Sequence, residues 1–186
     1  MKSIKGFTLV ELVMVVVLLG VLSMAGYHIM TFSIQHSFYL PHQLEADLAA
    51  AEALEIMVEG DSATVRGLRF CSAVTAIAAN QVNVTDQDGA ALQFRLDTGT
   101  GKLYRKIGTT GAETLAPYFM PNSVIFSGGG TGGALFTYYD SADVVTADYT
   151  LVRRIQIDLI ATQGSGSIDS YGGVSRQSTS VRVYNI

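Results

Sequence analysis

One acidic residue stands alone in a long apolar stretch near the start of the chain. Glu11 is the only formally charged residue between Phe7 and Phe32. A carboxylate in an apolar helix costs about 2.5–3.5 kcal/mol at the centre of a bilayer, and less near the interface. Such residues are usually functional and paired with a group of opposite charge. The sequence therefore predicts that Glu11 meets a cation at a similar depth.

The stretch around Glu11 is long enough to cross a membrane. As a helix rising 1.5 Å per residue, the run from Phe7 to Phe32 spans roughly 39 Å, against about 30 Å for a hydrocarbon core. Lys2 and Lys5 precede this run. The positive-inside rule therefore places the N-terminus in the cytoplasm and the remainder in the periplasm or outside.

The segment Lys5–Leu12 reads Lys-Gly-Phe-Thr-Leu-Val-Glu-Leu and resembles the processing site of type IV pilins and type II secretion pseudopilins. The resemblance extends over about residues 1–30. It implies that a prepilin peptidase cuts after Gly6 and then N-methylates the new first residue, Phe7. It also implies that Glu11 acts in filament assembly beside the amine of Phe7 in a neighbouring subunit.

The same resemblance implies a structural subunit with a single membrane span, held in the bacterial inner membrane before it enters a pilus or pseudopilus. Lys2 and Lys5 are then the positive charges of the leader. The implied partners are the prepilin peptidase, other pilin or pseudopilin subunits, the assembly platform protein, the assembly ATPase acting indirectly, and inner-membrane lipid. Gly20 and Gly26 are small residues that would allow neighbouring helices to approach closely.

The apolar start of the chain has two other interpretations. Ser23-Met24-Ala25 resembles the small-x-small cleavage site of an ordinary secretory signal, whose removal would leave a soluble product. An uncut segment would instead be a plain membrane anchor. In either case the remainder would be an exported or membrane-anchored binding module or enzyme. The net charge of -4 and the scattered basic residues give no strong sign of nucleic-acid binding.

A second helical pattern follows the apolar run. Pro41 removes one backbone hydrogen bond and is expected to kink or restart the helix. Beyond it, one apolar face is predicted to lie on a sheet, since its residues recur at three- and four-residue spacing. That face consists of Leu44, Leu48, Ala51, Leu54 and Val58. Gly60-Asp61 is expected to end the helix.

The remainder of the chain has the pattern of short strands. The predicted strands are Thr64–Cys71, Gln81–Thr85, Ala91–Asp97, Lys102–Ile107, Asn122–Ser127, Ala134–Tyr139, Tyr149–Ala161 and Ser178–Ile186. Asp86-Gln87-Asp88-Gly89 is a hairpin turn signal. The predicted fold class is α+β, with a long N-terminal helix packed on an antiparallel sheet, which is also the pilin fold that the resemblance implies.

The expected organisation divides the chain into four parts. Residues 1–6 form the prepilin leader, and residues 7–32 form the transmembrane or filament-core helix. Residues 33–60 form a kinked amphipathic continuation of that helix. Residues 61–186 form a periplasmic antiparallel β domain.

Few residues of the C-terminal part are arranged for chemistry. It contains no histidine, the commonest general base, so we expect no enzyme activity. Asp140, Asp143 and Asp148 are weak candidates for calcium ligands, because hard oxygen ligands suit that ion. A solvated loop fits their spacing better, and no resident cofactor is expected. The lone Cys71 lies in an apolar run and is expected to be a buried thiol.

The subclass rests on weaker features. Gly172-Gly173-Val174-Ser175-Arg176 and the last seven residues are similar to the ends of larger minor pilins and J-type pseudopilins. Many major pilins close a C-terminal loop with two cysteines, and this chain has one. Its length and lone cysteine favour a minor pilin or pseudopilin over a major subunit.

Overall fold

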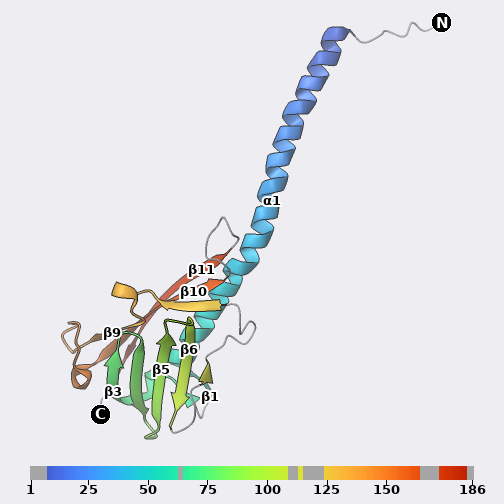
Figure 1. The fold of residues 1–186 in the computed structure, drawn as a ribbon. Coiled ribbons are helices and arrows are strands. Elements are labelled where there is room, and N and C mark those ends of the chain that lie inside the picture. The colour runs from blue at the N-terminus through green and yellow to red at the C-terminus, as the bar shows by residue number, and fades with distance from the viewer. Residues whose placement is uncertain (1–7, 63–64, 109–112, 115–123, 164–171, 184–186) are drawn as a thin grey trace. The chain divides into compact units, whose positions relative to one another are not determined.

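A computed structural model describes residues 8–62, 65–108, 113–114, 124–163 and 172–183. The chain divides into two compact units, Met1–Tyr39 and Leu40–Ile186, and each is described by itself. The elements in chain order are α1 (Leu9–Val58), β1 (Gly60–Ser62), β2 (Val65–Arg66), η1 (Leu68–Phe70), β3 (Cys71–Ala78), β4 (Gln81–Asp86), β5 (Ala91–Asp97), β6 (Lys102–Ile107), β7 (Glu113–Thr114), β8 (Val124–Gly128), η2 (Thr131–Gly133), β9 (Phe136–Tyr139), η3 (Tyr149–Leu151), β10 (Arg154–Gln163) and β11 (Gly173–Arg182). The α+β fold class is confirmed, and the architecture is consistent with a pilin-like fold (Figure 1).

The second unit contains two larger antiparallel sheets where the sequence predicted one. The first has the strand order β3-β4-β5-β6-β7. The second has the order β11-β10-β8, with β9 also paired to β10. A third, two-stranded sheet joins β1 to β2. Figure 1 shows the strands of the first sheet in green to yellow and those of the second in orange to red.

Alternating side chains build the core between these elements. On β10 every second residue is buried, so Ile155, Ile157 and Leu159 face the core while their neighbours are partly exposed. On β5 the same alternation buries Leu92, Phe94 and Leu96. This period of two is what one buried face of an antiparallel sheet requires.

A tyrosine links the two larger sheets by hydrogen bonds. The hydroxyl of Tyr138 on β9 lies 2.9 Å from the carbonyl oxygen of Ala78 and 2.7 Å from that of Gln81, at the β3–β4 turn. Burial raises the pKa of Tyr138 above its ordinary value, so the hydroxyl stays protonated and donates. At the same turn, the Leu135 amide donates to the Ala79 carbonyl at 2.9 Å.

The apolar face predicted for the second helical segment is wrong in part. The residues of α1 that are buried are Ala46, Ala49, Ala50, Ala53, Leu54 and Met57. Leu44, Leu48 and Ala51 of the predicted face are exposed, while Leu54 is buried and Val58 half-buried. Both sets of residues recur at helical spacing, so periodicity alone did not distinguish them.

The alanine-rich face of α1 is the buried one because other parts of the unit pack closely against the helix backbone. A Cβ atom at Gly173 of β11 would collide with the backbone of His42, and one at Gly67 with the backbone of Val58. Four of the six buried residues of α1 are alanines, whose small side chains allow that approach. Two hydrogen bonds fix the contact, because Gln43 Nε2 donates to Val174 O at 3.0 Å and Val174 N donates to Gln43 Oε1 at 3.1 Å.

Other boundaries differ from the predictions in informative ways. Helix α1 continues through Pro41, so the helix does not restart there, and the kink stays a prediction. Gly60, with a φ of 91°, follows the end of α1 as expected. The β5 and β6 strands are confirmed residue for residue, and the hairpin turn before β5 is confirmed with Gly89 at a φ of 84°.

Four strand predictions were displaced, one of them by two residues, since β9 begins at Phe136 and not at Ala134. The predicted strand Thr64–Cys71 is wrong, since Leu68–Phe70 forms a 3-10 helix and the long strand is β3. Residues 149–151 form another 3-10 helix, so β10 starts later than expected, and β11 starts five residues earlier than Ser178. The strand at Asn122–Ser127 corresponds to β8. Positions 64, 122, 123 and 184–186 of the predicted strands lie outside the described residues.

The close approach at Gly173 gives a direct test of this packing. Gly173→Ala is expected to lower the free energy of unfolding by about 1–3 kcal/mol, because the added methyl group overpacks a backbone contact. Gly99→Ala is the matched control, since a Cβ there meets only the Asp97 carboxylate at an ordinary 3.4 Å. Urea unfolding of the full chain in detergent, followed by circular dichroism, measures both. Equal stability of the two variants would contradict the packing.

Candidate functional site

The lone carboxylate of the apolar helix belongs to a capping box at the helix start. Thr8 N and Thr8 Oγ1 lie 2.9 Å and 3.0 Å from Glu11 Oε2, and both donate to it. In return, the Glu11 amide lies 3.3 Å from Thr8 Oγ1. The pattern Thr-x-x-Glu before an apolar run is the sequence signature of this motif, and it was missed in the sequence.

In this geometry Glu11 caps the start of the helix, and its own carboxylate is held in a fixed position. It satisfies a backbone amide that would otherwise lack a partner at the start of the helix. Both contacts from Thr8 go to Oε2, and within the described part of the chain Oε1 accepts no hydrogen bond. The carboxylate is thereby held in one position with one oxygen available to a further donor.

The other predicted residues of the N-terminal site are not placed. Lys2, Lys5, Gly6 and Phe7 lie outside the described residues. The predicted cleavage after Gly6, the N-methylation of Phe7 and the pairing of Phe7 with Glu11 therefore stay predictions.

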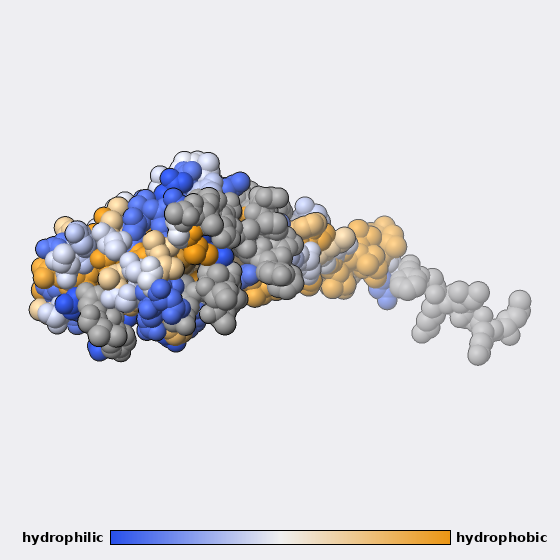
Figure 2. All heavy atoms as spheres, turned by 90° about the horizontal axis from the view of Figure 1, so that it is seen from below, coloured by the Kyte–Doolittle hydropathy of each residue, from blue (hydrophilic) through white to orange (hydrophobic). Residues whose placement is uncertain are grey.

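The helix that follows Glu11 exposes a continuous apolar surface. Its large hydrophobic side chains from Leu9 to Phe38 are exposed, and Figure 2 shows hydrophobic residues in orange along this segment. By length and composition α1 is able to cross a membrane. At Gly20 and Gly26 an added Cβ would meet nothing within 4 Å, so both leave open surface. These features fit a single-pass anchor.

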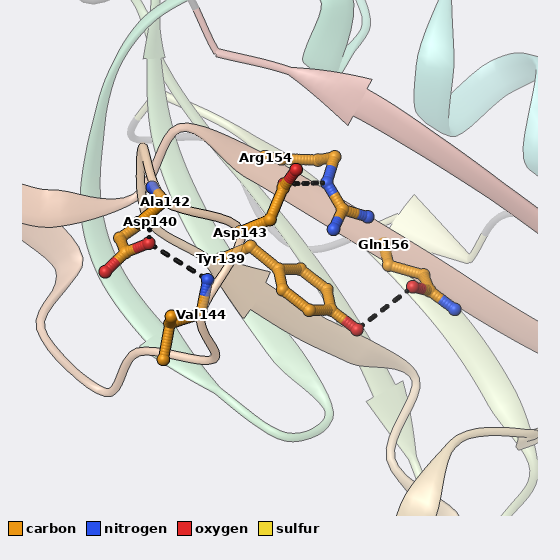
Figure 3. A network of polar contacts seen from close by, with 7 residues as sticks. All are labelled: Tyr139, Asp140, Ala142, Asp143, Val144, Arg154 and Gln156. Atoms are coloured by element: carbon orange, nitrogen blue, oxygen red, sulfur yellow. Dashed lines mark hydrogen bonds and ion pairs between the residues drawn. The ribbon is translucent and has the colours of Figure 1, made fainter.

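The three aspartates that were weak calcium candidates serve different local partners, and Figure 3 shows those of Asp140 and Asp143. Asp140 Oδ1 accepts from the amides of Ala142 at 2.8 Å and Val144 at 3.0 Å. Asp148 Oδ1 accepts from the Thr150 amide at 2.9 Å and from its hydroxyl at 2.7 Å. These bonds hold the pKa of the Asp148 carboxyl below its ordinary value.

Asp143 is engaged with a cation. Its Oδ1 accepts from Arg154 Nε at 3.0 Å, and the backbone of Asp143 has a φ of 58°. The Arg154 guanidinium also stacks over the Tyr139 ring at 3.8 Å, and the Tyr139 hydroxyl donates to Gln156 Oε1 at 3.2 Å. Among the described residues, no three His, Cys, Asp or Glu side chains are grouped to hold a metal ion. Calcium binding stays a prediction that these contacts do not support.

The lone cysteine is buried, as predicted. Cys71 at the start of β3 is only 2% exposed. Burial raises the pKa of the Cys71 thiol to about 11, so the nucleophilic thiolate is scarce at neutral pH. This thiol belongs to the core of the second unit.

Comparison with known families agrees with the N-terminal geometry. The family model described as the prokaryotic N-terminal methylation motif matches residues 1–27. This motif is the signature of type IV pilins and pseudopilins, and it implies processing by a prepilin peptidase and assembly with other pilin subunits. It points to a structural, pilin-type protein. No curated protein and no solved structure matches the chain.

The buried thiol gives a test of the second unit's integrity. Labelling of Cys71 with Ellman's reagent at pH 8 is expected to be at least about a hundredfold slower in the folded full chain than in urea, because the raised pKa and burial both suppress reaction. The folded-state pKa exceeds the ordinary value of 9.0. The thiol's contribution to stability is therefore present below about pH 9 and is lost as the pH rises toward 11.

A matched control is Cys71→Ser combined with Ser141→Cys, which places the only thiol on an exposed loop. This variant is expected to react at the ordinary rate. If Cys71 reacted as fast as the cysteine at position 141, the thiol would not be buried.

Proposed function

We propose that this chain is a minor subunit of a type IV pilus or of a type II secretion-like filament, cleaved after Gly6 and N-methylated on Phe7. The observation that carries the proposal is Glu11, positioned by Thr8 at the first turn of an exposed apolar helix. The methylation motif at residues 1–27 supports it independently.

The chemistry of assembly is the neutralisation of a charge. Cleavage after Gly6 leaves an amine on Phe7, and methylation keeps that amine protonable. In the filament, the amine of one subunit meets the Glu11 carboxylate of its neighbour. Removing one partner of a buried pair costs about 3–5 kcal/mol, because the remaining charge is left unpaired. The pair therefore selects the axial register in which every carboxylate meets an amine.

The capping box strengthens the selection of the axial register. Thr8 holds one carboxylate oxygen, so Glu11 does not need to be ordered at the moment of assembly. Positioning before binding reduces the entropy that association must overcome. The second oxygen then accepts from the incoming amine.

The membrane stores the subunit before assembly. The apolar segment of α1 occupies the inner membrane with the N-terminus in the cytoplasm and the β domain in the periplasm. A platform protein, driven indirectly by an assembly ATPase, then moves the helix from lipid into the filament. The lone Cys71 is buried in the core and unavailable for a C-terminal disulfide loop, which favours a minor subunit over a major one.

Substitutions at two positions separate the charge from the cap. Glu11→Ala removes both, whereas Glu11→Gln keeps the hydrogen-bonding pattern of a capping box and removes only the charge. Thr8→Val removes the hydroxyl and keeps the charge. Both Glu11 variants are expected to lower incorporation into sheared filaments about tenfold or more while cleavage stays intact, as expected for losing a buried ion pair.

Thr8→Val serves as the control for the cap. It is expected to assemble close to wild type, since an N-cap hydroxyl contributes only about 1 kcal/mol to a helix. Immunoblots of sheared filaments and of membranes measure incorporation and cleavage separately. If Glu11→Gln assembled like wild type and Thr8→Val did not, the cap and not the charge would be the functional element.

A further inference from the structure

Three polar side chains meet where α1 passes the end of β10. His42 and Glu45 lie one turn apart on α1, and His42 Nδ1 is 3.7 Å from Glu45 Oε2. Gln163 is the last residue of β10, and its Nε2 donates to the same Glu45 oxygen at 2.7 Å. We call His42, Glu45 and Gln163 the helix–strand cluster.

Two atoms of this cluster have no hydrogen-bond partner. Within the described part of the chain this is true of His42 Nδ1 and Gln163 Oε1, and both atoms are buried. Gln163 as a whole is only 6% exposed, so solvent does not satisfy its amide oxygen. Buried polar atoms without a partner are rare and unfavourable, and a bound ion is one of the partners that accounts for them.

The charge around the cluster favours a cation. Helix α1 contains no Lys or Arg, and its second half carries the acidic residues Glu45, Asp47, Glu52 and Glu55. A surface of one sign of charge concentrates ions of the opposite sign. The Glu45 carboxylate therefore lies in a region where a positive ion is stabilised.

The kinds of atom in the cluster suit a transition-metal cation. An imidazole nitrogen combined with a carboxylate oxygen is a common ligand pair for zinc, whereas calcium and magnesium favour oxygen ligands alone. The cluster contains one histidine and one acidic residue, so its third ligand is the amide oxygen of Gln163.

The distances admit one zinc ion. Zinc binds imidazole nitrogen and carboxylate oxygen at about 2.0–2.2 Å, so two ligand atoms of one ion lie at most about 4.3 Å apart. The 3.7 Å between His42 Nδ1 and Glu45 Oε2 is within this limit. A half-turn of the Gln163 amide brings its oxygen to the place that Nε2 occupies, 2.7 Å from Glu45 Oε2. A cation between these two oxygens removes their mutual repulsion.

We propose that the helix–strand cluster is a structural site for a divalent transition-metal cation such as zinc. Its ligands are His42 Nδ1, Glu45 Oε2 and Gln163 Oε1. The side chains of His42 and Glu45 are 38% and 22% exposed, so the ion enters from solvent and completes its coordination with water. Bound there, it fastens α1 to β10.

Titration of the wild-type full chain in detergent with zinc chloride tests the site. Isothermal titration calorimetry is expected to show one ion per chain. Circular dichroism is expected to show a Tm about 5 °C or more higher at a hundredfold excess of zinc over Kd, because an ion that binds only the folded state stabilises it. Calcium chloride, the probe for an oxygen-only site, is expected to give no such rise.

Substitutions of single ligands locate the ion. Gln163→Leu and His42→Ala are each expected to weaken zinc binding about tenfold or more, since groups that merely support a metal ligand already contribute that much. His36→Ala is the matched control, because His36 is an exposed histidine of the same helix and lies outside the cluster. It is expected to bind zinc like wild type, and melting without zinc shows whether each variant is folded.

Nuclear magnetic resonance of the imidazole nitrogens identifies the ligand atom. Zinc is expected to shift the Nδ1 resonance of His42 and to leave the resonances of His36 unchanged. The inference is overturned if wild type shows no saturable binding of one zinc ion, if either ligand variant binds zinc like wild type, or if His36→Ala loses binding. None of these measurements involves a filament, so their outcome and that of the proposed function are separate.

Discussion

An apolar helix surface that water cannot cover favourably is the constraint on which the rest of this protein depends. Burial of apolar surface contributes about 25 cal/mol per Å², and the segment of α1 before residue 35 exposes most of its large side chains. Such a helix persists only in lipid or against other protein. Exchange between those two environments is what a filament subunit drawn from a membrane must achieve.

In the proposed assembly, Glu11 supplies the selectivity that apolar contact between helices lacks. Hydrophobic attraction is non-directional, so it does not fix how far one helix slides along another. A carboxylate whose position is set by Thr8 adds one point at which the register is correct. Every other register leaves a charge unpaired in apolar surroundings, which is strongly unfavourable. In the proposed assembly, one side chain thus converts non-directional hydrophobic attraction into a defined axial step.

In the second unit, the two faces of α1 have different surroundings. Its inner face uses alanines, because Gly67 and Gly173 bring neighbouring backbone into direct contact with α1. Its outer face keeps leucines, although they cost solvation in the isolated subunit. Sequence periodicity predicted that Leu44 and Leu48 belong to an apolar face lying on the sheet, but both leucines are exposed. Four of the six buried residues of α1 are alanines, whereas the prediction placed Leu44 and Leu48 on the buried face.

Other features show where sequence reasoning holds and where it stops. The hairpins β4 to β6 were predictable, since alternating residues and the Asp86–Gly89 turn agree with one another. β3 was missed because Cys71–Ala78 is rich in alanine and lacks strong alternation. The capping box is legible in Thr8 and Glu11. The cation that pairs with Glu11 cannot be identified from this sequence, because in the proposed assembly it belongs to another chain and forms only after cleavage.

Intact-mass measurement of the protein purified from its own host tests most directly whether this chain is processed as a pilin before it assembles. The account predicts a mature chain that begins at Phe7 and is heavier by one methyl group than residues 7–186. N-terminal analysis would place that methyl group on the amine of Phe7. A chain that begins at Gly26 or retains Met1 would contradict the account.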